Sequence, residues 1–170
     1  MATARIPFAK VEGLQNDFLL VDARDAPVWM TAEAAAHWCD RRRGVGADGV
    51  LTLLPPTGGG AAARMHIYNA DGSEPEMCGN GLRCVVAVLA EPGSEVTIET
   101  PAGLRSGAVL RPDWIRTEMG TARPTGRVAD SGLDEVAEPG WAWSLGNPHL
   151  VLWTDADPER IRRKLEVGLD

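Results

Sequence analysis

Residues 69–84 read NADGSEPEMCGNGLRC, and this stretch decides the interpretation of the sequence around it. The run that it opens, Leu82 to Ala90, carries a single charged residue, Arg83. A helix that is apolar nearly all round is a buried helix, and this one is too short to cross a bilayer. We therefore expect a central helix wrapped by strands, with Cys78 on the loop at its N-terminus.

The position of Cys78 favours chemistry on an amino acid. A helix N-terminus offers free backbone N–H groups and the positive end of the helix dipole, and both favour a thiolate. Gly79 and Gly81 allow the backbone to approach a ligand closely, and the N–H groups of Gly79 and Asn80 are placed to hold a carboxylate. The alternative interpretation is that Cys78 is a small buried hydrophobe, as most free cysteines are.

The other two cysteines are expected to be packing residues. Cys84 follows later on the same helix beside Val85 and Val86, and Cys39 lies late in an earlier predicted helix. Three cysteines without a secretion signal indicate reduced thiols and a cytoplasmic location. No CxxC pair is present, so we expect no zinc or other metal site.

Composition excludes several classes of partner. The 170-residue chain is 44% hydrophobic and 24% charged, the balance of a globular protein. Its net charge of −7 argues against nucleic acid. No run of eighteen or more apolar residues is present, so we expect no membrane-spanning helix.

Many short strand-like segments and few helices predict an α+β fold with a mostly antiparallel sheet. Segments rich in β-branched and apolar residues alternate with Gly and Pro throughout the chain. Residues 124–140 are polar and are interpreted as a loop.

The stretch at 69–84 resembles the active-site motif of the diaminopimelate epimerases. Four further segments are similar to blocks of that family, in the same order: Phe8–Phe18, Arg43–Gly49, Thr117–Gly120 and Leu145–His149. Gln15 stands where the family usually has Gly. The resemblance implies a diaminopimelate-epimerase-like fold, with two pseudo-symmetric domains, each a curved sheet around a central helix, and the site between them. We place the domains at 1–113 and 114–170, the second of them incomplete.

Carried over position by position, the resemblance also implies the site. Five residues would contact the substrate, diaminopimelate: Asn16, Asn69, Gly79, Asn80 and Asn147. Cys78 would exchange the α-proton, and His149 would tune the ionisation of the thiols. Without the resemblance, Asn16 and Asn69 would be interpreted as turn-forming residues, because Asn is common in turns.

The family's reaction uses no cofactor. Many racemases need a pyridoxal electron sink held by a lysine, but Lys10 and Lys164 are the only lysines and neither has a phosphate-binding glycine loop beside it. The resemblance implies instead two thiols on opposite faces of the α-carbon. One removes the proton as a thiolate and the other supplies a proton to the opposite face, which interconverts LL- and meso-diaminopimelate for lysine and peptidoglycan precursor synthesis.

The family's second thiol has no counterpart in this sequence. Cys39 and Cys84 lack the glycine-rich helix start that the role requires. Three explanations stay open: a fragment, a split enzyme that pairs with a partner chain, or a decayed protein. A missing C-terminal half or a homodimer partner is therefore a candidate partner.

Other functions remain open beside the leading one. A histidine racemase carries the same thiol motif, whereas proline racemases usually carry His where Asn80 stands. A non-catalytic amino-acid-binding protein and a module that pairs with its other half are the alternatives from other classes.

Overall fold

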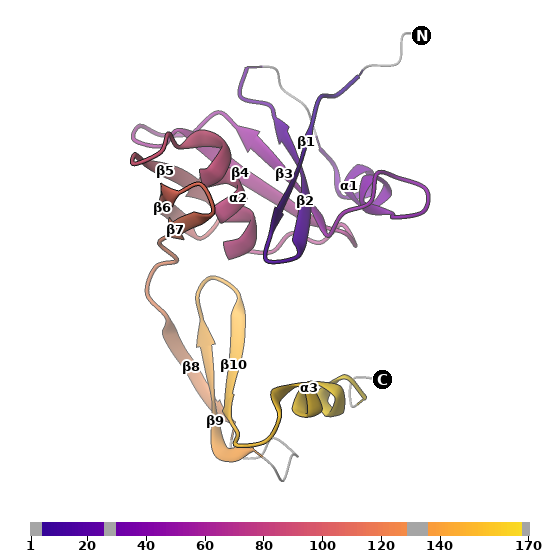
Figure 1. Ribbon diagram of the computed structural model, residues 1–170, viewed down its shortest axis with the longest axis vertical. Helices are drawn as coiled ribbons and strands as arrows, with labels where there is room; N and C mark the ends of the chain where they lie inside the picture. The colour runs from indigo at the N-terminus through magenta and orange to yellow at the C-terminus, as the bar shows by residue number, and fades with distance from the viewer. Residues whose placement is uncertain (1–4, 26–29, 129–135, 168–170) are drawn as a thin grey trace. The chain divides into compact units, whose positions relative to one another are not determined.

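The structure is a computed structural model that describes residues 5–25, 30–128 and 136–167 (Figure 1). The chain forms two compact units, Met1–Met119 and Gly120–Asp170, which we describe separately. Among the described residues, no helix has the length and apolar character needed to cross a membrane.

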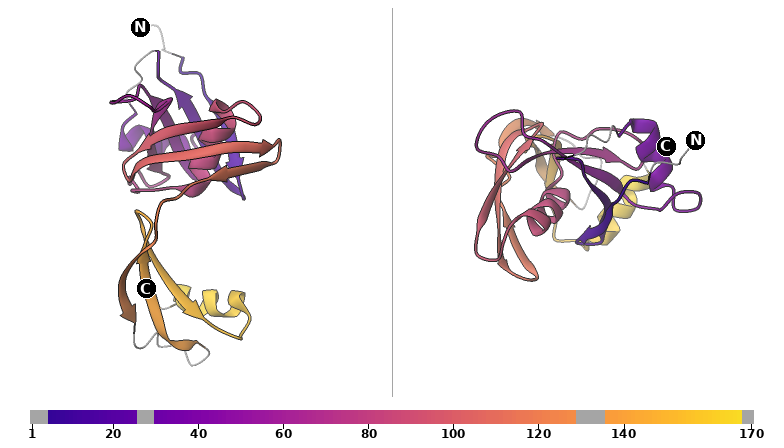
Figure 2. Two further views of the ribbon diagram at one scale, coloured as in Figure 1. Left: turned by 90° about the vertical axis from the view of Figure 1, so that its left-hand side faces the viewer. Right: turned by 90° about the horizontal axis from the view of Figure 1, so that it is seen from above.

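The first unit is built on one seven-stranded sheet with the strands in sequence order. Four neighbouring pairs are antiparallel, while β2 with β3 and β4 with β5 are parallel. The sheet curls around helix α2, so that the first and last strands both contact it (Figure 2). The predicted α+β fold with a curved, mostly antiparallel sheet around a central helix is confirmed. The strands are β1 Ala9–Gly13, β2 Asn16–Asp22, β3 Gly49–Leu54, β4 Ala63–Asn69, β5 Glu95–Thr100, β6 Gly103–Arg111 and β7 Trp114–Thr117.

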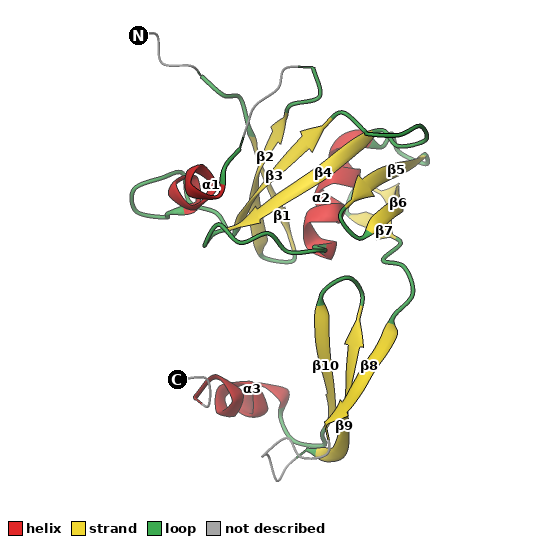
Figure 3. Cartoon of the chain, turned by 180° about the vertical axis from the view of Figure 1, so that it is seen from behind, coloured by secondary structure: helices red, strands yellow, loops and turns green. Residues whose placement is uncertain are grey.

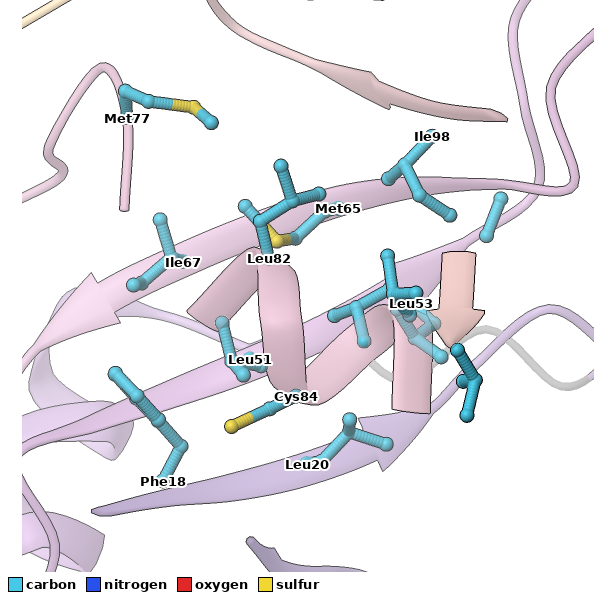
Figure 4. Packing of buried hydrophobic residues seen from close by; sticks show 14 residues of the cluster. Phe18, Leu20, Leu51, Leu53, Met65, Ile67, Met77, Leu82, Cys84 and Ile98 are labelled. Atoms are coloured by element: carbon cyan, nitrogen blue, oxygen red, sulfur yellow. The ribbon is translucent and has the colours of Figure 1, made fainter. Parts of the chain in front are cut away.

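Helix α2, Gly79–Leu89, fills the inside of the curled sheet. Leu82, Val85 and Val86 are fully buried and pack against side chains of the strands. Figure 4 shows this core, to which the strands contribute Phe18, Leu20, Leu51, Leu53, Met65, Ile67 and Ile98. The helix is not buried all round, because Val88 near its end is 48% exposed.

A second core lies on the opposite face of the sheet, under helix α1. This helix spans Ala32–Cys39 and is capped by Thr31, whose side chain accepts a hydrogen bond from the N–H of Ala34 at 3.2 Å. Neighbouring side chains of a strand point to opposite faces, so along β2 Phe18 and Leu20 reach the α2 core while Leu19 reaches the α1 core. Burial on both faces accounts for the unbroken apolar run in β2.

The second unit is smaller (Figure 3). It holds a three-stranded antiparallel sheet and helix α3: β8 Arg123–Val128, β9 Ala137–Ser144, β10 Pro148–Trp153 and α3 Pro158–Val167.

Two details of the predicted organisation differ from the structure. The polar segment 124–140 was expected to be a loop, but its first part is β8 and its end begins β9; residues 129–135 lie outside the described ranges. β8 is a strand because it pairs antiparallel with β9, which supplies its backbone hydrogen bonds. The division between units falls after Met119 rather than at 113, because β7 pairs with β6 and so belongs to the first sheet.

Candidate active site

One end of the seven-stranded sheet gathers several of the predicted site residues. Strand β2 begins at Asn16, β3 begins at Gly49 and β4 ends at Asn69. The strand register aligns Phe18, Gly49 and Asn69 across the three strands. Residues from distant parts of the sequence therefore meet at this end.

Cys78 begins α2 as its N-cap residue. Its Sγ accepts a hydrogen bond from the backbone N–H of Gly81 at 3.3 Å, and its side chain is half-buried. A Cβ on Gly81 would lie 2.9 Å from Leu51 Cδ2, and one on Gly79 would lie 3.1 Å from Met119 Cε. Glycine at these two positions lets the start of the helix approach its neighbours.

The remaining thiols are buried, as expected. Cys84 lies in the α2 core and Cys39 in the α1 core. Burial raises the pKa of both thiols, to about 11 for Cys84, because a thiolate loses its hydration there. Of the three thiols in this sequence, only that of Cys78 is partly open to solvent.

The first turn of α2 lies against Asn16. The side-chain Nδ2 of Asn80 donates to Asn16 Oδ1 at 3.4 Å. The first N–H groups of a helix have no acceptor within it, so those of Gly79 and Asn80 are available to an anion. The structure thus brings Cys78, Gly79, Asn80 and Asn16 together.

Asn69 lies at the same end of the sheet but uses its side chain locally. Its Nδ2 donates to Ser73 Oγ at 2.9 Å, and its carbonyl oxygen accepts from the N–H of Gly72 at 2.9 Å. It closes the turn that leads from β4 toward α2, which is the turn-forming role that the sequence also allowed. Its contact with a substrate stays a prediction.

Asn147 and His149 lie in the second unit, where β9 turns into β10. His149 Nε2 is 3.1 Å from Asn147 Oδ1, so the two side chains form a pair of their own. Their meeting with Cys78 stays a prediction.

A group of charged residues beside Asn16 was not predicted from the sequence. Asp17 and Asp48 each accept the other's backbone N–H, and Arg41 binds both carboxylates, with Nη2 at 2.6 Å from Asp17 and 2.9 Å from Asp48. Lys10 completes the group with an ion pair to Asp17 at 2.7 Å. Arg41 and Lys10 hold the pKa of Asp17 far below its usual range. The only signal in the sequence was that Asp17 and Asp48 fall in two of the family-like segments.

An open hollow of about 690 Å³ lies beside this site rather than in it. Its lining includes Glu12, Arg83 and Trp114, but not Cys78. The hollow touches α2 through Arg83, Cys84 and Ala87, and its lining includes none of the residues from Cys78 to Leu82.

Comparison with known proteins decides the family. Residues 8–124 match the family model described as diaminopimelate epimerase. The chain belongs to the diaminopimelate epimerase family. The matched residues include the whole seven-stranded sheet, Cys78, and the neighbouring Gly79, Asn80 and Asn16.

Curated relatives agree with the family model. The diaminopimelate epimerase of Acidiphilium cryptum is 42% identical over 168 residues, which cover 91% of this chain and 59% of the relative. That of Synechocystis sp. is 41% identical, over 88% of this chain and 60% of the relative. The chloroplastic enzyme of Oryza sativa subsp. japonica is 39% identical, over 85% of this chain and 46% of the relative. The chain therefore spans about 60% of the length of the two bacterial relatives.

Solved structures share the fold. A hydroxyproline epimerase from Agrobacterium vitis superimposes with a TM-score of 0.67 at 18% identity, over 94% of this chain and 55% of that one. A phenazine biosynthesis protein of the PhzF family from Bacillus anthracis gives a TM-score of 0.58 at 20% identity, over 88% of this chain and 55% of that one. The expected diaminopimelate-epimerase-like fold is confirmed.

Proposed function

We propose that this chain supplies one of the two proton-transfer thiols, and part of the substrate-binding site, of a diaminopimelate epimerase. Cys78 is the catalytic thiol, Gly79 and Asn80 bind the carboxylate at the reacting carbon, and Asn16 is a further substrate contact. Membership of the family and the names of the curated relatives support diaminopimelate as the substrate.

The observation that carries the proposal is the environment of Cys78. Its sulfur is the only partly exposed one of the three, it lies at a helix N-terminus, and it accepts a backbone N–H. Free N–H groups at the same helix end are suited to the carboxylate of an amino acid. These features support a proton-transferring sulfur next to a bound carboxylate.

The chemistry requires removal of a weakly acidic α-proton. The Cys78 thiolate takes the proton and becomes a thiol, and the electron pair left on the α-carbon is delocalised into the carboxylate. N–H groups aimed at that carboxylate stabilise the charge as it develops. A second acid then adds a proton to the opposite face, inverts the centre and is left as its conjugate base.

The second acid is supplied by residues other than the cysteines of this sequence. Cys39 and Cys84 are buried on the two sides of the sheet, so neither reaches a substrate at Cys78. A C-terminal segment of the same protein or a partner chain carries this group in the proposed enzyme. Asn147 and His149 are the proposed contacts from the second unit, and the unpaired thiols favour a reducing, cytoplasmic location.

Hydrogen exchange at the α-carbon tests the proposal. The chain, alone and together with the C-terminal half of the Acidiphilium cryptum relative, is incubated in D2O with LL- or meso-diaminopimelate, and deuterium at the α-carbon is followed by NMR. We expect exchange that falls by at least about 100-fold in Cys78→Ser, the usual range for loss of a general base. Cys39→Ser is the matched control and keeps the rate.

Two outcomes would contradict the proposal. Exchange that survives Cys78→Ser would show that another group removes the proton. Absence of exchange, both alone and after addition of the C-terminal half of the Acidiphilium cryptum relative, would show that this chain provides no catalytic half-site.

A further inference from the structure

Four side chains form one line of hydrogen bonds, which runs from Asp48 through Asn16 and Asn80 to Arg83 on α2, the helix that Cys78 caps. Asn16 Nδ2 donates to Asp48 Oδ2 at 3.0 Å, and Asn80 Nδ2 donates to Asn16 Oδ1 at 3.4 Å. Arg83 Nη2 donates to Asn80 Oδ1. The line joins β2, the segment before β3 and the first turn of α2.

The two end residues give this line its direction. An ionised carboxylate only accepts hydrogen bonds and a guanidinium only donates them, whereas an amide side chain does both. With Asp48 at one end, Asn16 must turn its NH2 group toward Asp48 and its oxygen toward Asn80. With Arg83 at the other end, Asn80 must turn its oxygen toward Arg83 and its NH2 group toward Asn16. The constraints from the two ends agree.

Asp48 is itself held in place. Its Oδ1 accepts from Arg41 Nη2 at 2.9 Å, and its Oδ2 accepts the backbone N–H of Asp17 at 3.0 Å in addition to Asn16. The side chain of Asp48 is 39% exposed, yet these bonds come from two different segments, the start of β2 and the residues after α1. A carboxylate fixed at both oxygens keeps its orientation and can impose one on its neighbour.

We propose that Asp48 and Arg83 are positioning residues that fix the amide orientations of Asn16 and Asn80 for substrate binding. The inference rests on the proposed function, in which those two amides contact the substrate. In the fixed orientation each amide keeps one N–H for a carboxylate, and Asn16 Oδ1 keeps one lone pair for an ammonium group. Reversal of either amide would set oxygen against the Asp48 carboxylate or NH2 against the Arg83 guanidinium.

Side-chain NMR reads the amide orientation directly. The sequence has four asparagines and one glutamine, so the labelled chain has only five side-chain carboxamide NH2 groups to assign. We expect one Asn16 hydrogen, the one bound to Asp48, to be shifted downfield and protected from exchange. Asp48→Asn should remove both signatures, and Arg83→Gln should move the NH2 signals of Asn80 and Asn16 together.

The matched controls change the same charges elsewhere. Asp40 and Arg43 form an ion pair after α1, with Arg43 Nε 2.9 Å from Asp40 Oδ2. Asp40→Asn and Arg43→Gln should leave the amide signals of Asn16 and Asn80 unmoved. Arg83→Lys keeps a group that only donates, and should preserve the orientation that Arg83→Gln loses.

Binding of diaminopimelate connects orientation to function. We expect Asp48→Asn and Arg83→Gln each to raise the Kd from NMR titration by about tenfold, the effect of losing a charge-assisted hydrogen bond. Arg83→Lys should restore most of the affinity. In a chain that already carries Asn16→Ala, Asp48→Asn should not raise the Kd further, because Asp48 acts through the Asn16 amide.

The results separate the positioning role from the proposed function. If Asn16→Ala and Asn80→Ala weaken binding while Asp48→Asn and Arg83→Gln change neither the amide signals nor the Kd, the positioning role is wrong and the proposed site stands. If Asn16→Ala and Asn80→Ala leave binding unchanged, or if the unsubstituted chain does not bind either alone or together with the C-terminal half of the Acidiphilium cryptum relative, both are wrong.

Discussion

Helix α2 carries two cysteines in opposite environments. Cys78 caps the start of the helix, is half-buried and accepts a backbone N–H, whereas Cys84 is 4% exposed among apolar side chains. The local sequence is glycine-rich around the first and valine-rich after the second. The comparison teaches that a position on the helix, and not the residue type, decides which thiol is available for chemistry and which one only packs.

The largest expected effect concerns the body of the helix. Leu82 is fully buried between α2 and the sheet, so Leu82→Ala should lower the free energy of unfolding by about 2–5 kcal/mol. Val88→Ala, on the 48% exposed side, should change it by less than about 1 kcal/mol. Urea unfolding measures both. Equal losses would show that the two sides of α2 are not divided into core and surface as described.

A smaller effect follows from the pKa of Cys84. Burial raises this pKa from 9.0 to about 11. Because the folded protein holds the proton more tightly than the unfolded chain, the stability contribution is complete below pH 9 and is lost as the pH rises toward 11. At about pH 10.5 the loss relative to about pH 8 should be about 2 kcal/mol.

Cys84→Ala provides the control for this pH dependence. The variant keeps every other titrating group, so the difference between its unfolding free energy and that of the unsubstituted chain isolates the thiol. We expect the unfolding free energy of the unsubstituted chain to fall by about 2 kcal/mol relative to that of Cys84→Ala from about pH 8 to about pH 10.5. A constant gap would mean that the Cys84 thiol ionises as easily in the folded protein as in the unfolded chain.

The smallest effect concerns the cap formed by Cys78. Ser is a preferred N-cap residue, so Cys78→Ser should keep the hydrogen bond from Gly81 and leave stability unchanged or slightly higher. Cys78→Ala removes the acceptor and should be less stable than the Ser variant by about 0.5–1 kcal/mol. Thermal unfolding of the two variants compares them. Identical stabilities would show that the contact between Sγ and the Gly81 N–H does not cap the helix.

Local sequence patterns predicted much of the fold and the position of Cys78 at the start of a helix. The nearly uncharged run from Leu82 predicted α2, and the glycines around Cys78 predicted a helix start with available N–H groups. Each of these signals lies within a few residues of the feature that it predicts. Local physics decides such features because helix caps and turns are made by neighbours in the sequence.

The remaining features depend on pairs that are distant in the sequence. Asp48 meets Asn16 across 32 positions, and Asn80 meets Asn16 across 64. No periodicity reports such a pair, since the curl of the sheet creates it. Strand β8 was missed for a similar reason, because its polar residues carry no hydrophobic alternation and it is a strand only through its pairing with β9.

Competitive alkylation tests the contrast between the two cysteines most directly. The folded chain is treated with iodoacetamide at neutral pH, and the labelling rate of each cysteine is read by mass spectrometry, with the denatured chain as the reference. We predict that Cys78 reacts at least about tenfold faster than Cys39 and Cys84, which burial disfavours as thiolates, and that diaminopimelate slows Cys78 alone. Equal rates for the three thiols in the folded chain, or labelling of Cys78 that diaminopimelate leaves unchanged, would contradict the account.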